Sequence, residues 1–132
     1  MRKRVAIART LVYEPDVILM DEPFGPLDAQ TRLILQDQLL GLWTSSRQTV
    51  IFITHDLVES IVLSNRVMVM SCSPGQIKSI YTVPIPHPRD VFHIHEVKGF
   101  SDIYDQLWQD IREELLSQVW SGQEKACTDG CR

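Results

Sequence analysis

Two adjacent carboxylates, Asp21 and Glu22, directly follow an apolar run at positions 17–20. A short apolar run that ends abruptly in charge predicts a strand buried on both faces of a parallel sheet. Ligands of open α/β sheets bind outside the carboxyl ends of the strands. One carboxylate could therefore hold Mg²⁺, and the other could orient or deprotonate a water that attacks a phosphoryl group. Taken alone, the pair also fits a solvated loop after a core strand.

Two further side chains stand where a strand or a turn ends. His55 follows a second apolar run, at positions 49–54, and Asp28 follows the turn residues Gly25 and Pro26. By residue type alone, a histidine after a strand packs or caps more often than it binds a ligand. Asp28 is by default the N-cap of the next helix. Both residues therefore carry a structural and a functional interpretation.

The elements that would position these residues alternate between helix and strand, which predicts an α/β fold with a mostly parallel sheet. The segment from 66 to 83 reads as strand, turn and strand, and so predicts a hairpin. The expected elements are a helix over residues 2–11, a strand over 17–20, a helix from about Ala29 to Ser45, a strand over 49–54, a helix from about Leu57 to Leu63, and strands over 66–70 and 77–83.

The chain changes character after residue 83. Pro84, Pro86 and Pro88 alternate through an extended segment that cannot join the middle of a sheet. A last helix is expected over residues 102–119, where apolar residues recur at every fourth position, and a frayed tail over 121–132. We therefore divide the chain into a core, 1–83, and an extension with a C-terminal helix and a disordered tail, 84–132.

Composition narrows the class of protein. The chain has 132 residues, of which 44% are hydrophobic and 23% charged, as in a soluble domain or part of a larger one. The net charge of -4 argues against bulk electrostatic binding to nucleic acid, so the basic residues at 2–4 are interpreted as a solvated helix face. No apolar run is long enough to span a bilayer. Three cysteines, an odd number, favour a reducing cytosol.

Four segments in register are far more specific than a lone Asp-Glu pair. Together they resemble the C-terminal half of an ABC transporter ATP-binding subunit, which implies part of the P-loop NTPase core. The four segments are Arg4-Val-Ala-Ile-Ala-Arg9, Val17-Ile-Leu-Met-Asp-Glu-Pro23, Gly25-Pro-Leu-Asp28 and Ile53-Thr-His-Asp56.

The resemblance assigns a role to each of four residues, with ATP and Mg²⁺ as the implied cofactors. Asp21 matches the Walker B aspartate, which supports Mg²⁺ through water. Glu22 matches the catalytic carboxylate that polarises the attacking water. His55 matches the switch histidine, which contacts the γ-phosphate and can donate a hydrogen bond without being charged. Asp28 matches the D-loop aspartate, which contacts the opposed subunit, so Asp28 and His55 are the expected cofactor-binding residues.

Other segments resemble importers for nitrate, sulfonate, taurine or related small anions. This resemblance implies an ATPase that couples hydrolysis to transport, as a head-to-tail dimer of ATP-binding subunits. Membrane permease subunits, and indirectly a periplasmic or lipoprotein solute-binding protein, are the implied partners, on the cytoplasmic face of the inner or plasma membrane. The segments are Pro23-Phe24-Gly25, Leu42-Trp43, Ser73-Pro-Gly-Gln76 and Val83-Pro-Ile-Pro-His-Pro-Arg89.

Several motifs of that family are absent from this sequence. There is no Gly-x-x-x-x-Gly-Lys-Ser/Thr phosphate loop, no Q-loop region and no signature glycines, and a start within a helix suggests truncation. In the family the phosphate-loop strand lies between the strands at 49–54 and 66–70, so we expect a gap there. Each unpaired buried group in such a gap would cost about 1–3 kcal/mol. The isolated chain is therefore expected to be marginally stable, to bind ATP very weakly and to be inactive.

Other functions stay open at this point. A DNA-repair or chromosome-structure ATPase of the same superfamily would carry these motifs, but it would be expected to show coiled-coil heptads or strongly basic surfaces, which this sequence lacks. A non-catalytic interaction or regulatory module could pair with an intact subunit through the Asp28 loop. His87, His93 and His95 could suggest a metal site, although no carboxylate or cysteine is placed convincingly nearby.

Overall fold

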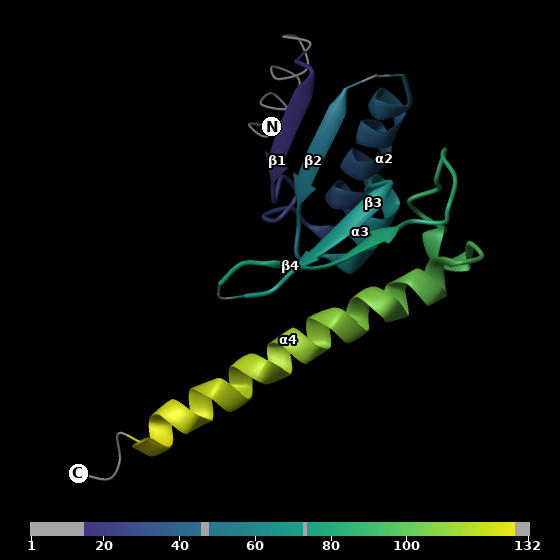
Figure 1. Cartoon of the computed structure of the whole chain (residues 1–132). Helices are drawn as coiled ribbons and strands as arrows, with labels where there is room; N and C mark the ends of the chain where they lie inside the picture. Colours follow the sequence, from purple (N-terminus) through teal and green to yellow (C-terminus); the bar gives the residue numbers. More distant parts are fainter. Residues whose placement is uncertain (1–14, 46–47, 73, 129–132) are drawn as a thin grey trace.

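A computed structural model describes residues 15–45, 48–72 and 74–128 (Figure 1). The helix predicted over residues 2–11 lies outside this part of the chain. The helix and strand order predicted for the rest is confirmed, and the last helix is longer at both ends than predicted, running through most of the expected tail. The elements are β1 (Val17–Asp21), α2 (Ala29–Ser45), β2 (Thr49–Ile53), α3 (Leu57–Leu63), β3 (Arg66–Met70), β4 (Ile77–Thr82), the 3-10 helix η1 (Ile94–Glu96) and α4 (Phe100–Thr128).

An aspartate directly precedes each of the helices α2 and α3. Asp28 accepts a hydrogen bond from the backbone N–H of Thr31 at 3.0 Å, so its prediction as the N-cap of α2 is confirmed. Asp56 has an extended backbone and accepts the N–H of Glu59 at 3.1 Å. Each such cap stabilises a helix by about 1 kcal/mol. The caps fix the points at which the loops after β1 and β2 end.

The described strands form two separate two-stranded sheets. β1 and β2 are parallel, with Val17 opposite Thr49 and Asp21 opposite Ile53. β3 and β4 form the predicted antiparallel hairpin. No described strand joins β2 to β3, which agrees with the gap expected where a phosphate-loop strand would lie (Figure 1).

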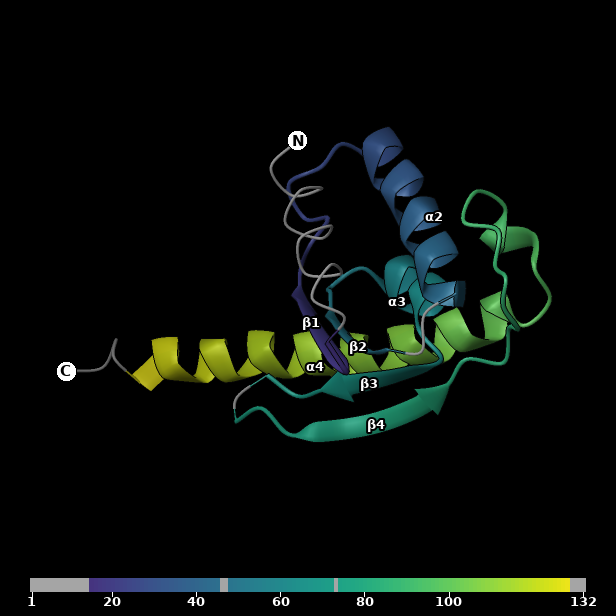
Figure 2. The same cartoon turned by 90° about the horizontal axis from the view of Figure 1, so that it is seen from above.

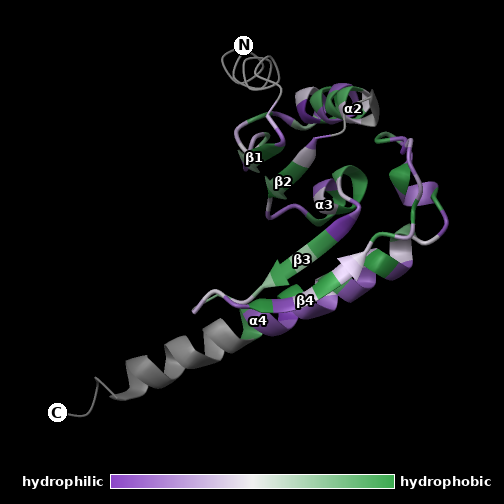
Figure 3. Cartoon of the chain, turned by 45° about the horizontal axis from the view of Figure 1, so that its top comes forward, coloured by the Kyte–Doolittle hydropathy of each residue, from purple (hydrophilic) through white to green (hydrophobic). Residues whose placement is uncertain are grey.

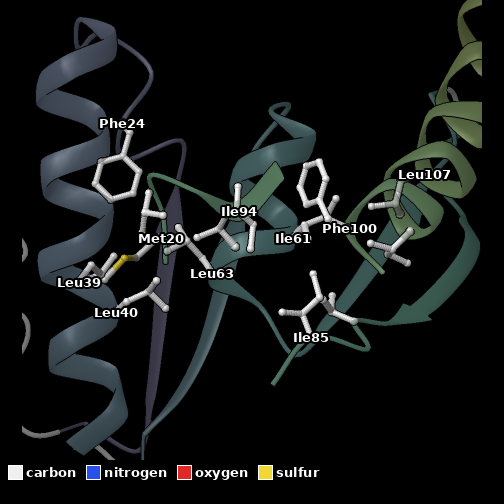
Figure 4. Close-up of a cluster of buried hydrophobic side chains, with 14 of the residues drawn as sticks. Met20, Phe24, Leu39, Leu40, Ile61, Leu63, Ile85, Ile94, Phe100 and Leu107 are labelled. Atoms are coloured by element: carbon white, nitrogen blue, oxygen red, sulfur yellow. The ribbon is translucent and has the colours of Figure 1, made fainter. Parts of the chain in front are cut away.

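The β1–β2 pair has one buried and one exposed face. Ile18 and Met20 are buried, and Met20 lies against α2 (Figure 4). Successive side chains of a strand point to opposite faces, and only one face of this pair is packed in the described part of the chain. The expectation of strands buried on both faces is therefore wrong for this chain. The apolar residues that expose about half of their surface or more on these strands are Val17, Leu19, Ile51 and Ile53.

One hydrophobic cluster joins the strands to the segment after residue 83. In Figure 4 it extends from Phe24 beside α2, past Ile94 and Ile61, to Leu107. Burying a side chain of this size stabilises a fold by about 1.5–3 kcal/mol. The extension therefore packs with the core at least as far as Leu107.

Arg89 ties the proline-rich segment to the end of α3. Its guanidinium is buried and donates to the carbonyl oxygens of Ile61, Val62 and Ser64 at 2.5, 3.1 and 2.6 Å. It also donates to the carbonyl oxygen of Ile85 at 2.9 and 2.6 Å. The last carbonyls of a helix lack partners within the helix and carry partial negative charge. Arg89 therefore caps α3 from a distant part of the sequence, and burial lowers the pKa of its guanidinium.

α4 runs along the β3–β4 hairpin (Figure 2). β3 is mostly apolar, whereas α4 carries many hydrophilic residues beside β4 (Figure 3). Lys78 bonds Glu113 at 2.8 Å, the hydroxyl of Tyr81 donates to Asp110 at 2.8 Å, and the hydroxyl of Ser79 donates to the same carboxylate. We call these five residues the hairpin–helix cluster.

Candidate functional site

β1 and β2 end side by side. The two strands are parallel and Asp21 pairs with Ile53, so both chains leave the sheet at the same edge. The backbone N–H of Glu22 donates to the carbonyl of Ile53 at 2.9 Å, which extends the ladder by one bond. The residues that follow the strands, Asp21-Glu22 and Thr54-His55, are therefore placed together.

The loop after β1 turns sharply at Glu22. Glu22 has a φ of 42°, in the left-handed region, and its carbonyl accepts the N–H of Gly25 at 3.2 Å. Phe24 is buried and packs against Phe52 of β2 with ring centroids 5.8 Å apart. The aromatic anchor and the turn together fix the direction in which the Glu22 side chain leaves the strand.

Glu22 and His55 form a direct contact. Nδ1 of His55 lies 3.0 Å from Oε1 of Glu22, and the side chains are 78% and 51% exposed, respectively. The hydrogen bond from Glu22, followed by its negative charge, raises the pKa of His55. An ionised carboxylate only accepts hydrogen bonds, so a hydrogen bond from His55 to it puts a proton on Nδ1 and leaves Nε2 for another partner. With Nδ1 donating to Glu22, a second donor at Nε2 would make the ring an imidazolium, and the contact of His55 with the γ-phosphate stays a prediction.

Asp21 offers an exposed carboxylate at the same strand end. Mg²⁺ prefers carboxylate oxygen, retains several waters and is held by one or two carboxylates together with substrate phosphates. Within the described residues, no group of three histidine, cysteine, aspartate or glutamate side chains could hold a metal ion. The role of Asp21 in holding Mg²⁺ through water stays a prediction.

Asp28 lies apart from Glu22 and His55, at the start of α2. Among the described residues it bonds within its own helix, chiefly to the backbone N–H of Thr31, which lowers the pKa of the Asp28 carboxyl. The side chain is exposed. Its role as a cap is confirmed, and its contact with an opposed subunit stays a prediction.

Four polar residues around His55 were missed by the sequence reasoning. They are Arg32 and Gln36 of α2, Thr54 of the turn after β2, and Glu59 of α3. Together with Glu22, His55 and Asp56 we call them the strand-end cluster. Most of them line a cavity of about 10 Å³, which is close to the space needed for one water molecule. The signal available in the sequence was the pair of polar residues one turn apart on a helix that is otherwise apolar on that face.

The other histidines do not form one site. Nδ1 of His93 lies 2.8 Å from Asp90, which raises the pKa of His93. The ring of His95 packs edge-on against Phe100, and burial lowers the pKa of His87. Each ring therefore has a separate environment in the part of the chain described.

Comparison with known proteins gives the family. No protein-family model matches the chain. It is 52% identical over 119 residues to an uncharacterized ABC transporter ATP-binding protein of Methanocaldococcus jannaschii, covering 90% of this chain and 43% of that protein. It is 50% identical over 122 residues to an aliphatic sulfonates import ATP-binding protein of Bacillus thuringiensis, covering 92% and 44%. It is 47% identical over 108 residues to a putative ATP-binding protein of Brucella melitensis, covering 82% and 45%.

These matches agree with the resemblance to ABC transporter ATP-binding subunits. The chain spans less than half the length of these relatives. Among the described residues no helix is long and apolar enough to cross a membrane. The parallel β1–β2 pair and the helices around it are consistent with part of a P-loop NTPase core. The chain belongs to the family of ABC transporter ATP-binding proteins and corresponds to a part of their length.

Proposed function

We propose that this chain contributes the hydrolytic side of an ATP site that drives import of a small anion such as a sulfonate, nitrate or taurine. The observation that carries the proposal is the contact between Glu22 and His55 at the shared end of β1 and β2. In this contact a carboxylate that can act as a base is hydrogen-bonded to an imidazole that can donate a hydrogen bond to phosphate. The name of the Bacillus thuringiensis relative supports a sulfonate among these solutes.

The residues divide the work by their chemistry. Bound Mg²⁺ would supply charge neutralisation of the phosphates, and Asp21 would hold it through water. The exposed carboxylate of Glu22 orients and polarises the attacking water. His55, oriented by Glu22, presents Nε2 to the γ-phosphate. Its raised pKa keeps the imidazolium form populated to a higher pH than an ordinary histidine would allow.

The remaining parts of the site come from outside this sequence. A phosphate-binding loop would be supplied by the rest of the domain, and Asp28 would contact a second ATP-binding subunit. Permease subunits on the cytoplasmic face of the membrane would receive the conformational change, and a solute-binding protein would act through them. A non-catalytic module is the competing function, in which the same surface binds an intact subunit but no phosphate is cleaved.

A hybrid protein tests the catalytic proposal. The matching segment of the Bacillus thuringiensis relative is replaced by this chain, so that the relative supplies the remaining length. We expect ATP hydrolysis by the hybrid, and a loss of about 10²–10⁴-fold in kcat in Glu22→Gln with ATP binding retained. The matched control is Glu113→Gln, which changes an exposed glutamate of α4. A hybrid that binds ATP and hydrolyses it equally fast with and without the Glu22→Gln substitution would contradict the assignment.

Calorimetry on the isolated chain tests the division of the site. We expect no measurable binding of ATP-Mg²⁺, because no phosphate loop is present in the sequence. Binding at micromolar affinity, which corresponds to about -8 kcal/mol, would mean that another surface of the chain binds the phosphates.

A further inference from the structure

The side chain of His55 makes few contacts of its own, so its position depends on other residues. The imidazole is 78% exposed, and its hydrogen bond within the described residues is the one with Glu22. An exposed side chain with one such partner is positioned mainly by its backbone. The position of that backbone depends on the neighbouring residues Thr54 and Asp56.

Thr54 and Asp56 each bond to other side chains, and these bonds connect both residues to α2. The hydroxyl of Thr54 donates to Glu59 at 2.6 Å and accepts the N–H of Asp56 at 3.0 Å. The same Glu59 carboxylate accepts Nε2 of Gln36 at 2.9 Å. Gln36 and Glu59 are each only 4% exposed, so this hydrogen bond is shielded from water. Gln36 therefore holds Thr54 through one buried carboxylate.

Arg32, one helical turn before Gln36, makes a second connection. Its Nη1 lies 3.3 Å from Oδ2 of Asp56, and its Nη2 donates to the carbonyl of Leu27 at 3.3 Å. Residues four apart lie on the same face of a helix, so Arg32 and Gln36 reach the turn after β2 together. Arg32 also joins that turn to the loop that precedes Asp28.

We propose that Arg32 and Gln36 are positioning residues for His55, which lock the turn at residues 54–56 onto α2 and thereby keep the imidazole against Glu22. Neither side chain touches His55, so neither is a catalytic residue. An effect of these residues on ATP hydrolysis rests on the proposed function, whereas their positioning of His55 does not. The competing explanation is that the two residues only stabilise the packing of α2 on α3.

An NMR titration of the His55 imidazole separates these explanations. Glu22 is the main group that raises the pKa of His55, and Asp56 and Glu59 raise it further. Arg32 is bound to Asp56 in this turn, so its removal acting through charge alone would raise the pKa. Loss of position acts in the opposite direction, because the imidazole moves away from Glu22. The sign of the change therefore identifies the role.

We expect the pKa of His55 in Arg32→Gln to fall most of the way to the value measured in Glu22→Gln, which removes the carboxylate partner directly. Gln36→Met changes no charge and should also lower the pKa. Arg32→Lys, which keeps the cation but can reach only one partner at a time, should give an intermediate value. The matched controls are Gln30→Met at the exposed start of α2 and Arg112→Gln on α4, and both should leave the pKa unchanged.

A rise or no change in the pKa of His55 in folded Arg32→Gln and Gln36→Met would overturn the inference, even if both variants melt earlier. If Arg32→Gln does not fold, Gln36→Met and Arg32→Lys decide the question. The titration needs no nucleotide. An inactive hybrid whose His55 still responds to Gln36→Met would therefore refute the proposed function alone, and an active hybrid without this response would refute the inference alone.

Discussion

The strand-end cluster and the hairpin–helix cluster contain similar residues but are built differently. In the hairpin–helix cluster, Ser79 and Tyr81 both donate to Asp110, so the polar groups satisfy one another. In the strand-end cluster, the hydrogen bond between Gln36 and Glu59 is buried, whereas the side chains of Glu22 and His55 are largely exposed. The Ser79, Tyr81 and Asp110 part of the first cluster is closed, whereas the second cluster leaves a carboxylate and an imidazole accessible.

This difference shows how a structural polar network can be told from a functional one. A network that joins two elements gains by satisfying every donor and acceptor internally. A network that serves chemistry must leave some groups accessible and hold them in place through others. Exposure of Glu22 and His55 beside the buried Glu59 fits the second description. Each prediction below separates the two clusters or links them.

The largest effect is expected from Arg89→Met, which removes the distant anchor of α3 and so disturbs the strand-end cluster. Five hydrogen bonds to carbonyl oxygens are lost. Each buried carbonyl left without a partner costs about 1–3 kcal/mol, so we expect at least about 3 kcal/mol of lost stability in urea denaturation. Arg66→Met, at an exposed position of β3, is the control. If Arg89→Met loses no more stability than Arg66→Met, the hydrogen bonds of Arg89 do not stabilise the fold.

Asp110→Ala should break the hairpin–helix cluster alone. The hydroxyls of Ser79 and Tyr81 lose their acceptor, and we expect a loss of about 1–3 kcal/mol in stability. The pKa of His55 should not change, because the Asp110 carboxylate bonds to residues of β4 and to none of the strand-end cluster. Asp105→Ala, at an exposed position of the same helix, is the control. A shifted His55 pKa in folded Asp110→Ala would show that the two clusters are coupled.

Asp28, the N-cap of α2, allows capping to be separated from contact with a second subunit. Asp28→Ala should lose about 1 kcal/mol of stability because the N-cap of α2 is removed. Asp28→Asn, which keeps a capping side chain, should lose at most about a few tenths of a kcal/mol. If the carboxylate also contacts an opposed subunit, both variants should reduce ATP hydrolysis by the hybrid. Full activity of Asp28→Asn would leave only the capping role.

The smallest effect is the dependence of stability on pH. The pKa of His55 is raised by Glu22, so the folded state binds the proton more tightly than the unfolded state. The stability from this contact is fully present below the ordinary histidine pKa and is lost as pH rises through the raised value. Melting of the chain and of Glu22→Gln across this range should converge at high pH. A difference that grows with pH would contradict the contact.

Much of the fold followed from local signals. The bounds of α2 and α3 were predictable because aspartates precede both helices and cap them. The polar residues at the ends of β1 and β2 were predictable because an apolar run stops before each of them. These features depend on short segments of sequence, which is why they could be read without a structure.

The features that depend on distant neighbours were not predictable. The exposed face of β1, where Leu19 is 66% exposed, depends on what packs against the strand and not on the strand itself. The burial of Gln36 against Glu59 depends on where α3 packs relative to α2. Arg89 lay in a proline-rich segment with no sign that it would reach α3.

The backbone at Glu22 has a consequence for laboratory evolution. A φ of 42° is uncommon for any residue other than glycine, asparagine or aspartate, and it costs an ordinary side chain about 1–2 kcal/mol. Selection of random variants for heat resistance alone should therefore enrich glycine or asparagine at position 22. Under the proposed function, selection of the hybrid protein for import of its solute should remove the same variants. Opposite enrichment at one position under the two regimes would reveal a carboxylate that is retained against the preference of its own backbone.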